Sequence, residues 1–200
     1  MKSMTRLILV GTVLLSVAVS TQASISVNAL NYNASSAALG AVWFDSVGSM
    51  TFDGSGNPVV SSGTLANNTT KVDFLFGASS GNLDHSSGVF TLAAGLPFNG
   101  FLNGGVVNVT SATIGGGGAG FYQMRAWVGG ATFADAANTK VGSSAVTGIT
   151  FGGTPLAGGT AIASPDLNLH AAFAVVSVPE PATLALGLFG AAGLLFRRRK

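Results

Sequence analysis

Two uncharged apolar runs, Leu7–Val19 and Ala182–Phe196, constrain this chain more than any other feature. Each run lies beside cations near one end of the chain, which is typical of targeting or membrane segments rather than of a globular core. Setting both ends aside leaves residues 24–178, which are about 155 residues and enough for one domain with its own core. We therefore expect three parts: a leader over 1–23, a folded domain over 24–178 and a C-terminal signal over 179–200.

The N-terminal segment has the three parts of a secretory signal peptide. Lys2 and Arg6 precede the apolar run, and Thr21-Gln22-Ala23 places small residues at the positions that a signal peptidase reads. We predict cleavage after Ala23. The alternative is an uncleaved N-terminal anchor, but a run of about 13 residues is short for a membrane span.

The C-terminal segment combines a proline-flanked acid, an apolar run and a basic end. Pro179 and Pro181 keep Glu180 extended and prevent a helix from starting earlier. Fifteen helical residues rise about 22 Å, which local thinning of the roughly 30 Å hydrocarbon core can match. We predict a single transmembrane helix over 182–196, with the domain outside the inner membrane. Four cations form the cytoplasmic stop: Arg197, Arg198, Arg199 and Lys200.

This tail resembles the PEP-CTERM sorting signal in its triplet of Pro179, Glu180 and Pro181, its short span and its terminal arginines. The resemblance implies an exosortase, a membrane-embedded cysteine transpeptidase, as the processing partner, and removal of the tail. It also implies a Gram-negative bacterium that makes extracellular polysaccharide. The protein would be held transiently in the inner membrane and would then reach the cell surface or the extracellular matrix of a biofilm. A plain tail anchor is the alternative.

The middle of the chain is poor in charge. It holds three cations, Lys71, Arg125 and Lys140, against six aspartates, which gives a net charge of −3, and it has no glutamate or cysteine. Nucleic-acid binding needs Lys and Arg clustered on one face, so no nucleic-acid partner is expected. The absence of cysteine excludes disulfides and thiolate metal sites.

Short apolar or alternating runs recur through the middle, separated by clusters of Gly, Asn, Ser and Asp. This spacing predicts an all-β fold, a β-sandwich (jelly-roll or Ig-like) of about eight strands. The expected strands are Ile25–Asn31, Ala41–Val47, Val72–Phe76, Gly88–Leu92, Val106–Ile114, Phe121–Val128, Val146–Phe151 and Ala171–Ser177.

The run Phe121–Val128 carries a distinctive motif. Period-two alternation separates an apolar face of Tyr122, Met124, Ala126 and Val128 from a second face of Phe121, Gln123, Arg125 and Trp127. Together with the following turn, which contains Asp135, this stretch resembles a Gln-x-Arg-Ala-Trp motif in a group of PEP-CTERM proteins. The resemblance implies no activity.

Two interpretations of this motif stay open. Trp127 and Arg125 on one face could form a platform on which a sugar ring stacks. Alternatively, Trp127 packs beneath the 129–137 turn and Arg125 pairs with Asp135, which we favour because residues i and i+2 beside a turn of small residues suit packing. Gln123, Arg125, Trp127 and Asp135 are therefore candidates for a ligand face or for a structural one.

Three further motifs match only part of the sequence pattern that their chemistry requires. Gly115-x-Gly117-x-x-Gly120 matches a dinucleotide fingerprint, but a predicted strand follows it instead of a helix, so we interpret the run as a flexible turn. Asp53-x-Ser55-x-Asn57 begins like a calcium loop, but Pro58 and Thr64 replace the glycine and glutamate that the loop needs. Asp84-His85-Ser86 are sequence neighbours and cannot supply the geometry of a Ser-His-Asp triad. We expect no catalytic residue, no metal site and no cofactor.

These observations rank three functions. A structural or adhesive role at the cell envelope or in the matrix comes first, and a carbohydrate-binding module for exopolysaccharide comes second. A secreted hydrolase comes third, because the chain offers only His85 and His170 as imidazole bases and no Gly-x-Ser-x-Gly elbow around any serine. An enzyme is therefore not expected.

Overall fold

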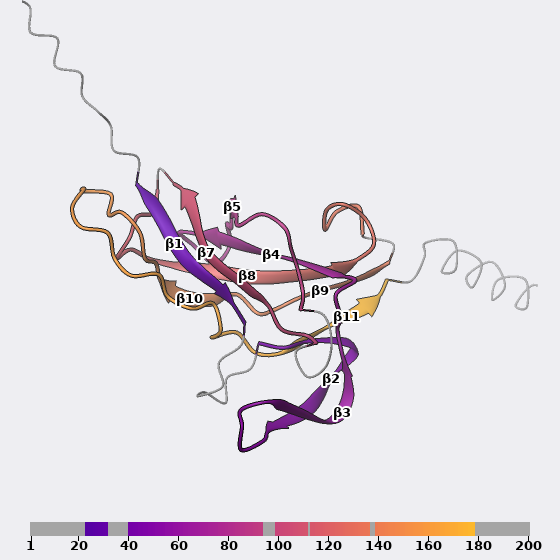
Figure 1. The fold of residues 1–200 in the computed structure, drawn as a ribbon. Helices are drawn as coiled ribbons and strands as arrows, with labels where there is room; N and C mark the ends of the chain where they lie inside the picture. Colours follow the sequence, from indigo (N-terminus) through magenta and orange to yellow (C-terminus); the bar gives the residue numbers. More distant parts are fainter. Residues whose placement is uncertain (1–22, 32–39, 94–98, 112, 137–138, 179–200) are drawn as a thin grey trace, which may run out of the picture.

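The computed structural model describes residues 23–31, 40–93, 99–111, 113–136 and 139–178 (Figure 1). Within these ranges the chain is all-β, with eleven strands and no helix, so none of it forms a helix that could span a membrane. The strands are β1 (Ser24–Leu30), β2 (Val42–Phe52), β3 (Pro58–Leu65), β4 (Thr70–Gly77), β5 (His85–Ser86), β6 (Phe90–Thr91), β7 (Asn103–Thr110), β8 (Ala119–Val128), β9 (Lys140–Ser143), β10 (Thr147–Thr150) and β11 (Phe173–Ser177). The predicted leader, apart from Ala23, and the predicted span over 182–196 lie outside the described residues.

The strands form two sheets. The larger sheet has nine strands and runs in the order β3-β2-β11-β9-β8-β4-β5, with β10 beside β8 and β6 beside β4. β1 and β7 form a separate antiparallel pair, which lies across the larger sheet in Figure 1. β11 pairs with β2 in parallel, whereas its other neighbour, β9, is antiparallel to it.

The hydrophobic core lies between the two sheets. Alternate residues of β1, β4 and β8 point into it and are fully buried: Ile25, Val27, Ala29, Val72, Phe74, Phe76, Tyr122, Met124 and Ala126. Val107 and Val109 of β7 pack against the same cluster from the smaller sheet. Two layers that share one core are the arrangement that alternating apolar runs favour.

The two layers are uneven. The strands divide nine to two, whereas a jelly-roll or Ig-like sandwich divides its strands almost evenly. Irregular chain completes the smaller layer, because Ser26 of β1 exchanges backbone hydrogen bonds with Gly152, and the N–H of Asn28 donates to the carbonyl of Pro165. β1 therefore has backbone hydrogen-bond partners along both edges.

The differences from the predicted strands have physical causes. The strand predicted over 106–114 lies earlier, over 103–110, because the Ser111 hydroxyl turns the chain by accepting hydrogen bonds from the N–H groups of Thr113 and Ile114. Sequence patterning does not predict β3, whose six central residues are all exposed and so show no alternation. It also misses β9 and β5, which are too short to carry a period.

Candidate functional site

The candidate site is the outer face of β8, where the Gln123-x-Arg125-Ala126-Trp127 motif lies. β8 pairs with β4 along most of its length and with β9 and β10 on its other edge. Its inward residues from Tyr122 to Ala126 are buried and alternate with half-buried outward residues, as the sequence predicts. Trp127 is the exception, because it belongs to the outward set and yet is 0% exposed.

Arg125 pairs with Asp73, which lies directly opposite it on β4. Its Nε donates to Asp73 Oδ1 at 2.9 Å, and its Nη2 donates to Oδ2 of the same carboxylate. Two parallel bonds of this kind fix the plane of the guanidinium and are stronger than neutral hydrogen bonds. The predicted pairing of Arg125 with Asp135 is therefore wrong, because the strand register gives Arg125 a different carboxylate.

The loop that follows β8 covers this ion pair and Trp127. The ring centroid of Phe133 lies 4.8 Å from the Arg125 guanidinium carbon and 6.0 Å from the Trp127 centroid, with the two rings edge to face. Lys71 holds the loop down, because its Nζ donates to the carbonyl of Gly130 at 2.6 Å. Trp127 is thus packed beneath the loop, and it has no exposed ring face on which a sugar could stack.

Asp135 organises the loop instead of reaching the strand. Its Oδ2 accepts hydrogen bonds from the hydroxyl and the backbone N–H of Thr132, at 2.8 and 3.0 Å. These bonds, chiefly the one from the hydroxyl, hold the pKa of the Asp135 carboxyl below its ordinary value, and the charge of Lys71 acts in the same direction. A carboxylate bonded to nearby donors in this way stabilises a turn.

Gln123 also binds within the fold. Its Nε2 donates to the carbonyl of Ser144 at 2.9 Å, and the Ser144 hydroxyl accepts the N–H of Met124 at 3.0 Å. Gln123, Arg125 and Asp135 therefore each have an intramolecular partner, and together they hold β8, β4 and two loops in one arrangement.

A serine–histidine contact lies beside the smaller sheet, but it lacks the geometry of a hydrolase. His85 Nε2 is 2.9 Å from Ser111 Oγ, and Asp84 approaches the same nitrogen at 3.6 Å. A triad needs the carboxylate at Nδ1, on the other side of the ring. Ser111 is also buried, and its hydroxyl is already the acceptor that shapes the turn after β7. Asp84, His85 and Ser86 do not assemble a triad.

The carboxylate of Asp53 is occupied by its own turn. Its Oδ1 accepts the N–H groups of Ser55 and Asn57, and its Oδ2 accepts the amide of Asn57. These bonds, above all that from the backbone of Asn57, lower the pKa of Asp53. Among the residues that the structure describes, no three His, Cys, Asp or Glu side chains gather as a metal ion would require.

Tyr122 and His170 form a buried pair that strand patterning does not indicate. The Tyr122 hydroxyl is 3.3 Å from His170 Nδ1, and His170 Nε2 is 3.2 Å from the carbonyl of Gly40. A carbonyl only accepts, so Nε2 carries the proton and Nδ1 accepts from the tyrosine. Burial raises the pKa of Tyr122 to about 12 and lowers the pKa of His170 to about 4, so the pair is neutral. Its role is to join β8 to the chain before β2 and β11.

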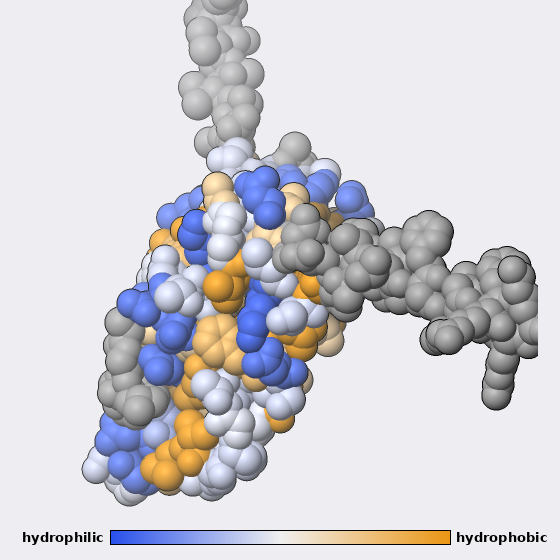
Figure 2. Space-filling model, turned by 90° about the vertical axis from the view of Figure 1, so that its right-hand side faces the viewer, coloured by the Kyte–Doolittle hydropathy of each residue, from blue (hydrophilic) through white to orange (hydrophobic). Residues whose placement is uncertain are grey.

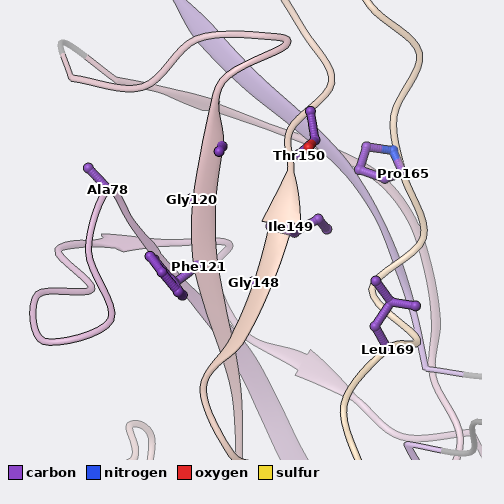
Figure 3. Close-up of a pocket in the computed structure, with 9 residues that line it drawn as sticks. Ala78, Gly120, Phe121, Gly148, Ile149, Thr150, Pro165 and Leu169 are labelled. Carbon is purple, nitrogen blue, oxygen red and sulfur yellow. The ribbon is translucent and has the colours of Figure 1, made fainter.

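An apolar hollow lies beside the first half of β8 (Figure 3). It has a volume of about 670 Å³ and is lined by Ala78, Ala119, Gly120, Phe121, Gly148, Ile149, Thr150, Pro165 and Leu169. Phe121 faces outward here, and its register partner on β10 is Gly148, which has no side chain to cover the ring. Sequence reasoning misses this hollow because its lining comes from four separate segments.

The predicted sorting residues lie at or beyond the edges of the described chain. Pro179, Glu180, Pro181 and the cations Arg197, Arg198, Arg199 and Lys200 fall outside the described residues. Ala23, the predicted cleavage residue, is buried, and its carbonyl accepts the N–H of Ser111 at 3.1 Å. At the other end, the N–H of Val178 donates to the carbonyl of Thr139 at 2.9 Å.

The fold is thus an all-β domain whose last strand leads directly into the C-terminal tail. Residues 177–200 of that tail match the family model described as the PEP-CTERM protein-sorting motif. The motif indicates an exported protein that an exosortase processes and whose precursor is anchored in a membrane. No curated protein and no solved structure matches the chain significantly. The grouping by the Gln-x-Arg-Ala-Trp motif stays a prediction.

Proposed function

We propose that the processed domain is a structural or adhesive component of the cell surface or the extracellular matrix. One observation carries the proposal: the polar side chains of the β8 motif bind within the domain, with Arg125 on Asp73 and Gln123 on Ser144. A recognition or catalytic site needs polar groups that converge on an open space. The side chains of this motif instead join β8 to β4 and to the loop after β9, which supports a structural role.

The exposed apolar side chains of the domain are scattered over its surface. Figure 2 shows hydrophobic and hydrophilic residues interleaved in narrow bands on one face of the domain. Exposed apolar side chains are spread over separate elements, among them Val47 on β2, Val106 on β7 and Val176 on β11. Apolar side chains scattered singly in this way are normal on a protein surface, so they do not by themselves mark a binding interface.

Two experiments test this role: fractionation of the native cells, and titration of the processed protein purified from them. We expect most of it to remain with the envelope or matrix fraction, and calorimetric titration with the organism's exopolysaccharide to show no saturable binding. Saturable binding would favour the carbohydrate-binding function instead. Turnover of any ester, glycoside or peptide in a substrate library would favour a secreted hydrolase.

A carbohydrate-binding function has one observation in its favour, namely the hollow at Phe121 (Figure 3). An outward aromatic ring can stack against the apolar face of a sugar, although the hollow offers few polar groups to orient it. If exopolysaccharide binds, Phe121→Ala should abolish the binding, while Val106→Ala, at an exposed position on β7, should leave it unchanged.

The sorting function has a separate test. Glu180→Ala should block processing and leave insertion intact, whereas neutral replacements of Arg197, Arg198, Arg199 and Lys200 should let the tail slip and missort the protein. Each cation at the centre of a bilayer costs about 2.5–3.5 kcal/mol, so four of them make a firm stop. Intact mass of the native protein gives the result, and a mass that matches all 200 residues would contradict processing at both ends.

A further inference from the structure

The sorting motif overlaps the folded domain. The family match begins at Ser177, and Ser177 is the last residue of β11 (Phe173–Ser177). Val178 is also held by the fold, through its hydrogen bond to the Thr139 carbonyl. Pro179 is the next residue, so the Pro-Glu-Pro triplet begins within about 4 Å, one peptide unit, of a residue that the domain binds.

The two halves of β11 are held differently. Phe173, Ala174 and Val175 pair with β2, and Val175 is fully buried in the core. Val176 and Ser177 instead pair with β9, and Val176 is 45% exposed. Their other edge has no partner strand among the described residues, because the pairing between β11 and β2 ends at Val175.

The course of β2 explains this difference. β2 pairs with β11 as far as Phe44, and the next residue, Asp45, has a left-handed φ of 60°. The pairing of β2 with β3 also shifts register between Phe44 and Ser49, which indicates a bulge. The bulged strand bends away, and the end of β11 is left with β9 and Thr139 as its backbone partners.

Residues Val176–Val178 can therefore separate from β9 without disturbing the core. Separation breaks the ladder to Val141 and Lys140, while Phe173 and Val175 keep their buried positions. Three extended residues span about 10 Å, so their release moves the Pro-Glu-Pro triplet that far from the domain.

We propose that Val176–Val178 are a releasable part of the sorting signal, which the exosortase takes up only after they detach from β9. Peptide-binding clefts commonly use the backbone hydrogen-bonding groups of an extended segment. In the folded domain, β9 and Thr139 occupy these groups along one edge of Val176–Val178. The inference rests on processing of the tail by an exosortase, and it adds that recognition begins inside the domain.

A disulfide between β9 and β11 tests the inference. Val141 and Val176 are antiparallel register partners, and Cα atoms of such partners are about 4.5–5.5 Å apart, within the range that a disulfide spans. The chain has no cysteine, so Val141→Cys with Val176→Cys creates a single bridge. Thr51→Cys with Val59→Cys, register partners in the β2–β3 hairpin, is the matched control.

Processing of the full-length chain is followed by pulse-chase and intact mass in cells that carry the exosortase. We expect the oxidised bridge between positions 141 and 176 to slow processing at least tenfold, and reduction to restore it. The control bridge should leave the rate within twofold of the parent. Six Gly and Ser residues inserted between Val178 and Pro179 should restore processing of the bridged chain, because they supply a free extended backbone next to the triplet in place of Val176–Val178.

Three results would overturn the proposal. These are processing of the bridged chain at the parent rate, equal slowing by the control bridge, and failure of the insertion to restore cleavage. If the first bridge prevents folding, Lys140→Cys with Ser177→Cys, the neighbouring register pair, replaces it with the same expected result. Different results would contradict processing by an exosortase: a parent chain that stays uncleaved, or a Glu180→Ala chain that is cleaved like the parent.

Discussion

Arg125 and Asp73 face each other across β8 and β4, and their ion pair lies beneath the ring of Phe133. The Asp73 side chain is 6% exposed, whereas that of Arg125 is 26% exposed. A buried carboxylate that loses its partner keeps the cost of desolvation without the attraction that offset it. Loss of either side chain of this pair should therefore destabilise the domain.

Arg125→Met should destabilise the domain by about 2–4 kcal/mol at neutral pH, somewhat below the full cost for a completely buried pair because Arg125 is partly hydrated. Asp135→Asn should cause a much smaller loss, because Asp135 is exposed and bonds only within its loop. Urea denaturation of the processed protein measures both. A double-mutant cycle should show coupling of Arg125 to Asp73; coupling of the same size to Asp135 would contradict the structure.

Trp127→Ala should lower the free energy of unfolding by about 3–5 kcal/mol, the usual cost of removing a buried aromatic side chain. This is a large part of the roughly 5–15 kcal/mol that holds a domain together, so poor soluble expression is a second expected sign. Val106→Ala, at a side chain that is 61% exposed, is the control and should stay within about 0.5 kcal/mol. A fully stable Trp127→Ala protein would favour a role in ligand binding instead.

The β8 motif shows what sequence alone can predict here. Period-two alternation correctly predicts which residues from Tyr122 to Ala126 face the core, because the pleat follows from the backbone alone. It does not predict Asp73 as the partner of Arg125, since that requires the register between strands 52 residues apart. Sequence distance favours Asp135 instead. The sorting signal in the tail can be predicted because it is recognised as a linear peptide. Its prediction needs no register between distant strands.

The glycine run before β8 shows a second limit of sequence reasoning. As text, Gly115-x-Gly117-x-x-Gly120 suggests a nucleotide loop or a flexible turn. In the fold, a Cβ built on Gly116 would lie 1.9 Å from the backbone oxygen of Gly153. Close packing of two backbones therefore requires glycine at this position.

Gly116→Ala should accordingly destabilise the domain by about 1–3 kcal/mol, since the clash is with backbone that cannot rotate away. Gly54→Ala is the matched control, because a Cβ at Gly54 meets no atom within 4 Å. Its melting temperature should stay close to that of the parent. Equal melting temperatures for all three proteins would show that the contact between Gly116 and Gly153 does not constrain the fold.

His170 gives the domain a predictable dependence on pH. Burial lowers the pKa of its imidazole from 6.5 to about 4, so between these values the unfolded chain binds a proton that the folded chain does not. The contribution of neutral His170 is complete above pH 6.5, is lost progressively as the pH falls to 4, and changes little below that. A difference of about 2.5 in pKa corresponds to roughly 3 kcal/mol.

Urea denaturation of the processed protein at intervals from pH 7.5 to pH 4.5 measures this loss. His170→Gln removes the titrating ring, so it should lower stability at pH 7.5, where the bonds to Tyr122 and Gly40 are lost, but should flatten the slope between pH 6.5 and pH 4.5. The carboxyls of Asp53 and Asp135 have lowered pKa values, so their contributions are lost only as the pH falls through those lowered values, at the acid end of the range. A parent protein equally stable at pH 7.5 and pH 4.5 would contradict a neutral, buried His170.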